Sequence, residues 1–495
     1  MKRTLLVIAV MLSVLGILCS CSHTDGDFSS TLIKRIPSED GDAEKADASS
    51  DEPLVWADKT YLYAVIDDCG KYKEEDYTKT SYAAFEKEVE KARAVAADDT
   101  VEQEEADSTA HELAEAYKLL MKRADFSETE KLLERLEKLD RSCYTESALG
   151  YLDEAVEKAK EMIDPDSSQK TSDEAFDLLS EAVHNLACKP VESGEKGKYV
   201  NRSVFPSRGD GTEFEMSEAT EKKFSSAATA RLGMGYFVLD LETGANLTFN
   251  ADIPQFQAST AKAQFCLYMY SLIDSGKASF DDELEYKEKH YSVGSGEIKN
   301  TPFGSKYKLS YLINRALTIS DNCAFHMMVD NYDYREYNKF IKALGCKYAG
   351  EVLPGAHFGS SSPRDTIKIW TEIYTYTRYG ANGEQFRGYL EESAYNSVGE
   401  GIPEYDVAHK SGWTSAQFND FAIVYAPHPY LVVTYLPVVD GSERKLVTKF
   451  SDAVNDVLSE YHDYIYADDE FFLHTLEEND GGEDAQKTDK ESKKQ

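Results

Sequence analysis

The chain has 495 residues, 29% of them charged and 41% hydrophobic, and a formal net charge of −36. This length exceeds what a single core serves, so we expect two or three soluble domains with linkers. The acidic balance argues against nucleic acid as a partner, because a phosphate backbone is bound by clustered Lys and Arg. It equally disfavours adhesion to anionic lipid through basic patches.

The N-terminus carries one apolar run, Leu5–Leu18, which is preceded by the basic residues Lys2 and Arg3. Its fourteen residues are too few to span a bilayer, so the run is typical of a signal peptide. It ends in Leu18-Cys19-Ser20-Cys21, which resembles a bacterial lipobox. The resemblance implies a lipoprotein signal peptide over residues 1–21, a lipidated Cys21 and a lipid anchor on the extracytoplasmic side of a cell membrane. An ordinary signal peptide with incidental cysteines is the alternative.

Residues 22–52 are rich in Ser, Asp, Gly and Glu, which predicts a disordered tether. Over residues 53–190, apolar side chains recur at helical spacing, and the segment repeats itself. Tyr77-Thr78 precedes Val89-Glu-Lys-Ala92 just as Tyr144-Thr145 precedes Val156-Glu-Lys-Ala159, at an offset of 67 residues. We expect two antiparallel helical units stacked side by side, since neither could bury its apolar stripe alone.

These repeats are similar to the FIVAR helical modules of Gram-positive surface proteins. The resemblance implies a Gram-positive cell surface and contact with cell-wall polysaccharide through the repeats. A spacer that lifts the next domain off the membrane is the alternative.

Residues 191–212 are expected to be a linker, and residues 213–465 have a mixed pattern. Strands are predicted over 235–240 and 245–249, then helices, then strands over 421–425 and 430–434 and a helix over 446–461. This order predicts an α+β domain with one antiparallel sheet flanked by helices. The fold class is therefore multidomain, a helical repeat domain followed by an α+β domain, and residues 466–495 are expected to be an acidic disordered tail.

Ser259-Thr-Ala-Lys262 follows the first strand pair and opens an apolar segment. Residues i and i+3 share a face of a helix, so Lys262 can lie beside the Ser259 hydroxyl, where a desolvated amine can act as its base. The helix N-terminus would add a favourable dipole for a developing oxyanion. The tetrad is weak evidence alone, because it also occurs at Ser167, Ser193 and Ser442.

Two further motifs follow in order. Ser320-Asp321-Asn322 lies 61 residues after Ser259, and Lys410-Ser411-Gly412 lies 90 residues later, before the late strands. S-x-x-K, S-D-N and K-T-G form the signature of class A β-lactamases and penicillin-binding proteins. The chain resembles this serine hydrolase superfamily over roughly residues 213 to 465, with Ser411 in place of the threonine.

The resemblance implies roles for the matching residues. Ser259 would attack a carbonyl and become acylated, Lys262 would remove its proton, and Ser320 would relay a proton to the leaving nitrogen. The substrate-binding residues would be Asn322, Lys410, Ser411, Gly412 and Trp413. Lys410 and Ser411 would hold a substrate carboxylate, and the backbone N–H groups of Ser259 and Trp413 would form the oxyanion hole. Asp321 is expected to be a structural carboxylate.

The chain departs from class A enzymes in the loop between the second and third motifs. The R-x-E-x-x-L-N pattern, whose glutamate activates the deacylating water, is absent. Glu351 is the only acid between Gly345 and Pro354, so it is the candidate deacylation base. Without such a base, hydrolysis of the acyl-enzyme would be slow or would use another group.

Other residues are expected to be structural. Cys266 stands where many class A enzymes have a disulfide cysteine, but the partner position is Ile313, so we expect a buried thiol. His409 beside Lys410 is interpreted as a strand residue. No C-x-x-C or H-E-x-x-H spacing occurs, so neither a metal nor another cofactor is expected.

We therefore predict a lipid-anchored serine hydrolase that forms an acyl-enzyme on Ser259 with β-lactams or related amides, such as the peptidoglycan stem peptide. One alternative is a D-Ala-D-Ala-type cell-wall peptidase, a penicillin-binding protein. Another is a β-lactam or cell-wall receptor that hydrolyses poorly.

Overall fold

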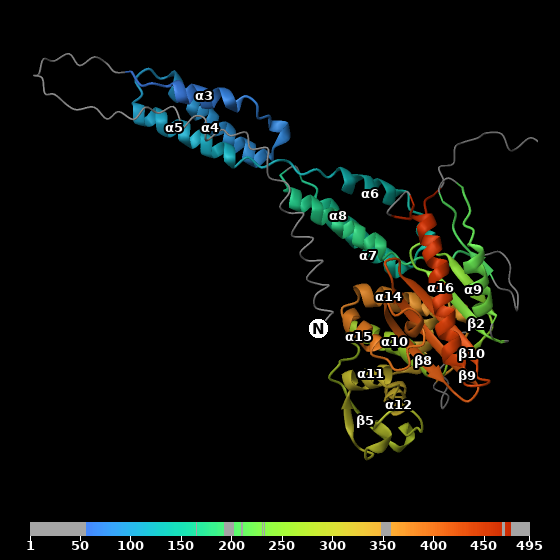
Figure 1. Cartoon of the computed structure of the whole chain (residues 1–495). Helices are drawn as coiled ribbons and strands as arrows, with labels where there is room; N and C mark the ends of the chain where they lie inside the picture. The colour runs from blue at the N-terminus through green and yellow to red at the C-terminus, as the bar shows by residue number, and fades with distance from the viewer. Residues whose placement is uncertain are drawn as a thin grey trace, which may run out of the picture.

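The computed structural model describes residues 56–164, 166–192, 202–208, 211–229, 231, 233–347, 358–467 and 471–476. The predicted signal peptide with Cys21, the predicted tether at 22–52 and Glu351 lie outside these residues. A helical arm leads into a larger α+β domain (Figure 1). Within the described ranges, none of the helices combines the length and the apolar character that crossing a membrane requires.

The arm consists of two three-helix units. The first unit contains α3 (Thr60–Cys69), α4 (Lys79–Ala97) and α5 (Gln103–Lys118). The second contains α6 (Ser127–Glu137), α7 (Glu146–Met162) and α8 (Gln169–His184). The repeat predicted from the sequence has a structural counterpart, because α4 and α7 both begin at a threonine cap. The Thr78 side chain accepts from Ser81 N and the Thr145 side chain from Ala148 N, each contributing about 1 kcal/mol to its helix.

The predicted side-by-side stacking of the units is wrong. The units follow one another along the arm (Figure 1), and the first buries its own core around Leu62, Phe85 and Leu113. The physical reason is that the third helix covers the apolar stripe of the first unit, whereas the second unit buries its apolar side chains in the core that it shares with the α+β domain. The two units still touch at Asp166, whose carboxylate accepts from Thr80 N at 3.0 Å and Thr80 Oγ1 at 2.8 Å.

The second unit is joined to the α+β domain by a shared core and by buried hydrogen bonds. Asn185 Oδ1 accepts from Tyr374 OH at 3.1 Å and from Arg378 Nε at 2.5 Å. Cys188 N donates to Leu241 O at 2.7 Å, in the turn between the first two long strands. The second unit is therefore part of the folded body, whereas the first unit has a core of its own.

The α+β domain is built on a six-stranded sheet in the order β1-β3-β2-β10-β9-β8, with every neighbouring pair antiparallel. Its strands are β1 (Arg202–Val204), β2 (Gly235–Asp240), β3 (Asn246–Phe249), β8 (Asp406–Trp413), β9 (Gln417–Tyr425) and β10 (Tyr430–Pro437). Two small sheets pair β4 (Gln255–Phe256) with β7 (Ser360–Ser361) and β5 (Glu283–Glu285) with β6 (Lys306–Lys308).

Both faces of the large sheet are covered. In β2, Tyr236 and Val238 enter the core shared with α9 (Glu218–Ala228) and α16 (Glu443–Ile465), whereas Phe237 and Leu239 enter the core on the opposite face. The helices on that opposite side are α10 (Ala261–Asp274), α11 (Leu309–Thr318), α12 (Asn322–Asn331), α13 (Tyr334–Ala343), α14 (Pro363–Tyr379) and α15 (Gly383–Glu391). The predicted fold class, a helical region followed by an α+β domain with an antiparallel sheet, is confirmed.

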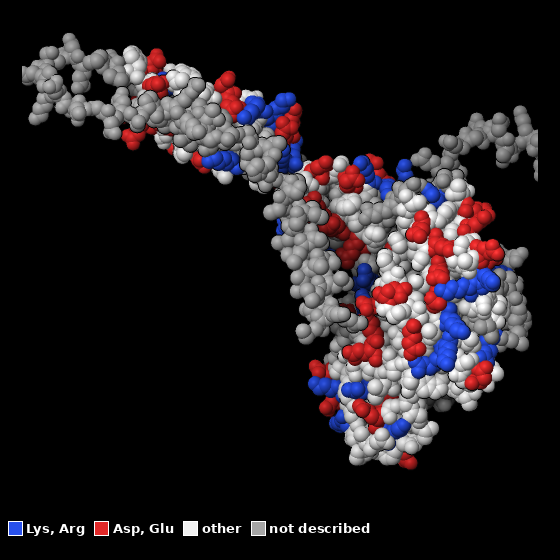
Figure 2. Space-filling model, in the orientation of Figure 1, with Lys and Arg blue, Asp and Glu red and all other residues white. Residues whose placement is uncertain are grey.

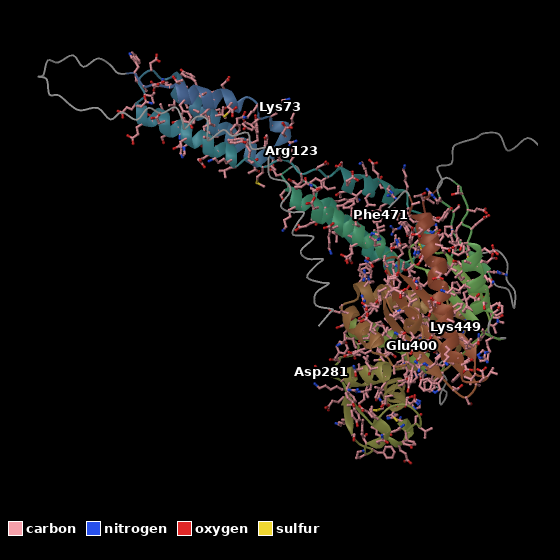
Figure 3. All side chains as sticks on the ribbon, viewed as in Figure 1. Lys73, Arg123, Asp281, Glu400, Lys449 and Phe471 are labelled. Atoms are coloured by element: carbon pink, nitrogen blue, oxygen red, sulfur yellow. The ribbon has the colours of Figure 1, made fainter. Side chains whose placement is uncertain are left out.

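Two expectations need correction. Residues 202–204 of the expected linker form β1, because they pair with the edge strand β3 at Asn246–Thr248 and satisfy its backbone. Residues 471–476 of the expected disordered tail pack against the arm: Phe471 is buried, and Thr475 bridges to Leu139. Phe471 lies where the second helical unit meets the α+β domain (Figure 3), and its carbonyl accepts from Arg135 Nη2 at 2.9 Å.

Candidate active site

Ser259 lies in a 3₁₀ turn, Ala258–Thr260, at the N-terminus of α10. Ala258 has a φ of 51°, an uncommon conformation for a residue with a side chain, so surrounding contacts must hold the turn. One such contact is Asn419 on β9, whose Nδ2 donates to Phe256 O and Gln257 O, both at 2.9 Å. The central strand β9 thus fixes the position of the serine.

Lys262 is fully buried one turn further along, and its Nζ is surrounded by four oxygens. It lies 3.0 Å from Ser259 Oγ, 3.0 Å from Ser320 Oγ, 2.6 Å from Ser320 O and 2.7 Å from Asn322 Oδ1. Burial, together with the nearby charge of Lys410, holds the pKa of Lys262 well below its ordinary value.

The chemistry of these four oxygens indicates how a neutral amine would sit. Ser320 O and Asn322 Oδ1 can only accept hydrogen bonds, so they take both N–H groups of an uncharged Lys262. The other two oxygens belong to the hydroxyls of Ser259 and Ser320, and one of them at a time can donate to the single remaining lone pair. The geometry therefore suits a lysine that removes a proton from a serine hydroxyl.

The second motif forms the turn between α11 and α12. Ser320 has a φ of 59°, which turns its hydroxyl and its carbonyl towards the same amine. Asp321 Oδ1 accepts from Ala324 N as the cap of α12, and Oδ2 accepts from Glu297 N at 2.7 Å and Ile298 N at 3.0 Å. Asp321 is thus a carboxylate that holds the turn in place.

The third motif lies on the edge strand β8, which runs beside the start of α10 (Figure 1). A Cβ at Gly412 would lie 2.5 Å from Ser259 N and 2.8 Å from Thr260 N, so only glycine allows the strand to come this close. Among the described residues, the Ser259 N–H has no hydrogen-bond acceptor. This leaves a backbone donor free at the nucleophile.

Lys410 is buried on the same strand, and its Nζ donates to Ser411 O at 3.0 Å. Burial lowers its pKa to about 8. Ser411 Oγ donates to Ala394 O at 3.0 Å. Trp413 ends the strand with its side chain 47% exposed, at the mouth of the site.

The side chain of His409 lies on the face of β8 opposite to that of its neighbour Lys410. Its Nδ1 lies 2.8 Å from Asp420 Oδ1 and its Nε2 lies 2.9 Å from Ser393 O, and both its side chain and that of Asp420 are fully buried. The buried His409–Asp420 pair joins β8 to β9, and the contact with Ser393 joins β8 to the loop that precedes it. This fits the interpretation of His409 as a strand residue.

The structure brings together Ser259, Lys262, Ser320, Asn322, Lys410 and Gly412 from three distant segments. Glu351, the candidate deacylation base, lies outside the described residues. Cys266 is a buried free thiol and Ile313 is buried, as expected. Among the described residues, no three His, Cys, Asp or Glu side chains are grouped so that they could hold a metal ion.

Sequence reasoning missed three residues beside this cluster. The ring of Phe358 lies 5.4 Å from Lys262 Nζ and contributes to its burial. Tyr395 packs edge-on against Trp413 with ring centroids 4.9 Å apart, and the guanidinium of Arg444 lies 5.4 Å from the Tyr395 ring. The rings of Tyr395 and Trp413, with the side chain of Arg444, line a mainly apolar hollow of about 280 Å³. The only sequence signal for this hollow is Trp413, which directly follows the third motif.

Comparison with known proteins agrees with this geometry. Residues 219–458 match the model of a family described as "Beta-lactamase enzyme family". This segment contains every described residue of the cluster.

Solved structures are also similar to the chain. A mutant of PBP-A in an acyl-enzyme complex with penicillin G is 20% identical, with a TM-score of 0.45, over 49% of this chain and 96% of that one. A β-lactamase from Sphaerobacter thermophilus is 18% identical, with a TM-score of 0.44, over 49% of this chain and 98% of that one.

One curated relative is the "Polysaccharide lyase 8 family protein HylA" of Enterococcus faecalis, 32% identical over 151 residues, which are 30% of this chain. The chain spans 11% of the length of that relative. The family match and the residue cluster coincide in one part of the molecule: the C-terminal half of the chain contains a β-lactamase-like catalytic domain.

Proposed function

We propose that the C-terminal domain is a serine hydrolase in which Ser259 is acylated by β-lactams or by related amides that carry a carboxylate. The observation that carries the proposal is the position of Lys262 Nζ, buried and 3.0 Å from Ser259 Oγ. A neutral amine at this distance can act as the general base for the hydroxyl.

The reaction follows from the positions of the polar atoms. Ser259 Oγ attacks the carbonyl carbon while its proton passes to Lys262 Nζ. The negative charge that develops on the carbonyl oxygen is met by the free Ser259 N–H, at the N-terminus of α10. The proton then moves to Ser320 Oγ, 3.0 Å from the amine, and from there to the nitrogen that leaves the acyl group.

The substrate carboxylate is assigned to Lys410 and Ser411. Lys410 brings a cation into a site from which water is largely excluded, and the Ser411 hydroxyl can turn from Ala394 O to a carboxylate oxygen. Asn322 holds Lys262 through Oδ1, while its Nδ2 donates to Val293 O at 2.9 Å and retains a second N–H for a substrate carbonyl.

The fate of the acyl-enzyme decides between the related functions. No carboxylate of a described residue is hydrogen-bonded to Ser259, Lys262 or Ser320. Glu351 is the candidate for activating the deacylating water. If it does so, the protein is a β-lactamase; if no group does, the domain is a D-Ala-D-Ala-type peptidase or a receptor that stays acylated.

The test combines a fluorescent penicillin with a chromogenic cephalosporin. We expect covalent labelling of the parent chain and none of Ser259→Ala. Ser442→Ala is the matched control, because Ser442 opens another S-x-x-K tetrad but hydrogen-bonds to Asp440 and Arg231. Labelling of Ser259→Ala at the parental rate would refute the proposal.

The same assay separates the functions. Turnover of the cephalosporin that Glu351→Gln slows, with unchanged labelling, means a β-lactamase that uses this base. Persistent labelling without turnover means a peptidase or receptor, and release of D-alanine from a stem-peptide substrate then distinguishes the peptidase.

We also propose that Cys21 is lipidated and anchors the protein outside a Gram-positive cell membrane. Cys21→Ser should release the protein into the soluble fraction; retention of this variant in the membrane fraction would contradict the anchor. The helical arm is proposed to contact cell-wall polysaccharide, because its repeats resemble the FIVAR modules of Gram-positive surface proteins. A chain that lacks the arm yet sediments equally with purified cell walls would exclude this contact.

A further inference from the structure

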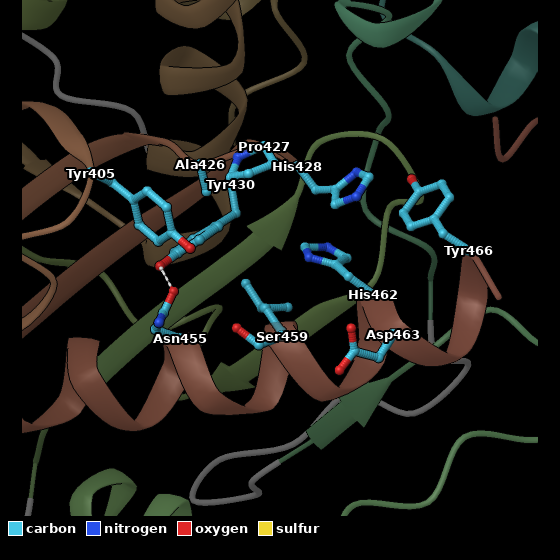
Figure 4. Close-up of a pocket in the computed structure, with 11 residues that line it drawn as sticks. Tyr405, Ala426, Pro427, His428, Tyr430, Asn455, Ser459, His462, Asp463 and Tyr466 are labelled. Carbon is cyan, nitrogen blue, oxygen red and sulfur yellow. Dashed lines mark hydrogen bonds between the residues drawn. The ribbon is translucent and has the colours of Figure 1, made fainter. Parts of the chain in front are cut away.

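A second pocket lies far from Ser259, between α16 and the turn that joins β9 to β10 (Figure 4). Its volume is about 330 Å³. Asn419, which holds the turn that carries Ser259, lies near the start of β9. The pocket is lined by Ala426, just after the end of that strand. Six residue steps of strand, about 20 Å, lead from Asn419 to Tyr425, so the pocket lies at the opposite end of β9 from the serine.

Buried carboxylates hold one wall of this pocket rigid. His428 Nδ1 lies 2.7 Å from Glu242 Oε2, and the His428 ring stacks on Tyr466 at 4.1 Å with an interplanar angle of 7°. Tyr466 OH donates to the same carboxylate oxygen at 2.5 Å. His462 Nε2 lies 2.6 Å from Oδ2 of the fully buried Asp240. The two imidazole rings are 4.6 Å apart, so their positions are set before any ligand arrives.

These contacts leave polar atoms unused. When His428 and His462 donate one N–H each to their carboxylates, His428 Nε2 and His462 Nδ1 remain as acceptors. Within the described residues, neither nitrogen has a hydrogen-bond partner. The same holds for the Tyr405 hydroxyl, the Ser459 hydroxyl and the Asp463 carboxylate, which also line the pocket.

The charges of the lining exclude some ligands. Among the residues that the structure describes, no Lys or Arg lines the pocket. Each imidazole and its carboxylate partner carry a net charge of zero or minus one, whichever way the imidazole is protonated, and Asp463 adds a negative charge at the exposed rim. Any cation that a phosphate or carboxylate ligand could meet here is therefore already neutralised by a carboxylate.

The remaining chemistry suits a hydroxyl-rich, uncharged ligand. The partly exposed rings of Tyr405 and Tyr466 offer apolar surface, and the unused atoms include both hydroxyl donors and nitrogen or oxygen acceptors. A pyranose ring has apolar C–H faces and hydroxyls that donate and accept. We propose that this pocket binds an uncharged saccharide unit, at a site separate from the acylated serine and independent of its activity.

The test uses the chain without residues 1–21 and a tetramer of β-1,4-linked N-acetylglucosamine as the probe, titrated by calorimetry. We expect saturable binding by the parent, weakened about tenfold or more by Tyr405→Ala and by Asp463→Asn. Ser459→Trp, which fills the pocket without removing a buried contact, should abolish binding. Asp452→Asn is the matched control, because this carboxylate is on α16, pairs with Lys223 at 3.0 Å and does not line the pocket.

Each other outcome overturns the proposal. One is the absence of saturable binding by the parent chain at millimolar probe, and another is parental affinity in Ser459→Trp. Binding of tetramethylammonium that Ser459→Trp abolishes, without binding of the tetramer, would assign the pocket to an organic cation. Penicillin labelling should proceed at the parental rate in all four variants, so failure here is distinguishable from failure of the serine hydrolase proposal.

Discussion

Replacing Lys410 by methionine should make the protein more stable at neutral pH while impairing its chemistry. Lys410 is buried, and its pKa falls from 10.5 to about 8. This difference corresponds to about 3 kcal/mol of unfavourable free energy for folding with the lysine charged. Loss of the hydrogen bond to Ser411 O offsets about 1 kcal/mol, so the net gain in Lys410→Met is about 2 kcal/mol.

The sign of the pH dependence follows from proton binding. The folded state holds the Lys410 proton less tightly than the unfolded state, so the unfavourable term is fully present below pH 8. It disappears as the pH rises from about 8 to 10.5. For a domain of this size, about 2 kcal/mol corresponds to a rise in Tm of about 4–8 °C at pH 7, and this advantage should vanish at pH 10.5.

Thermal melts of the parent and Lys410→Met at both pH values measure this effect. Lys449→Met, at an exposed lysine of α16 (Figure 3), is the matched control and should leave the Tm unchanged. Equal melting temperatures of parent and Lys410→Met at pH 7, or a difference that persists at pH 10.5, would refute the reasoning. Penicillin labelling by Lys410→Met should fall about 10- to 150-fold, because a charged hydrogen bond to the substrate contributes about 1.5–3 kcal/mol.

Four further outcomes are expected. Ser259→Ala should abolish penicillin labelling with a nearly unchanged Tm. Detection of a covalent penicillin adduct on this variant by mass spectrometry would contradict this prediction. Lys262→Met should slow labelling by about 10²–10⁴, the usual contribution of a general base, and a parental rate would remove Lys262 from that role. Gly412→Ala should slow labelling by about 10²–10³, because the new Cβ would lie 2.5 Å from Ser259 N; an unchanged rate would show that β8 can move away. Thr78→Ala and Thr145→Ala should each destabilise their unit by about 1 kcal/mol, measured by hydrogen exchange, and only Thr145→Ala should alter exchange in the catalytic domain.

The distribution of charge bears on the partners of both parts of the molecule. On the uncovered parts of the arm in Figure 2, acidic and basic side chains are interspersed. The sequence-based exclusion of nucleic acid rested on net charge alone. The surface view is consistent with that exclusion and with the proposal of uncharged saccharides as ligands.

Local patterns determined much of this protein in advance. The strand over 235–240 followed from its composition and the adjoining turn signal, and Ser259 and Lys262 were placed together because their spacing puts them on one helical face. Short-range geometry decides such features, so the sequence contains them. The membership of Ser320, Asn322 and Lys410 in the same site was implied by the resemblance that the three ordered motifs carry, not by local geometry.

Contacts between distant segments were decided only by the tertiary structure. The stacking of the helical units was mispredicted because a third helix closes the core of the first unit and the α+β domain covers the second. The ring of Phe358 beside Lys262, the Tyr395–Trp413 pair and the buried Glu242 that holds His428 each join segments with no shared pattern. Spacing along the chain specifies which residues share a helix or strand face, but which faces meet depends on how the whole core packs.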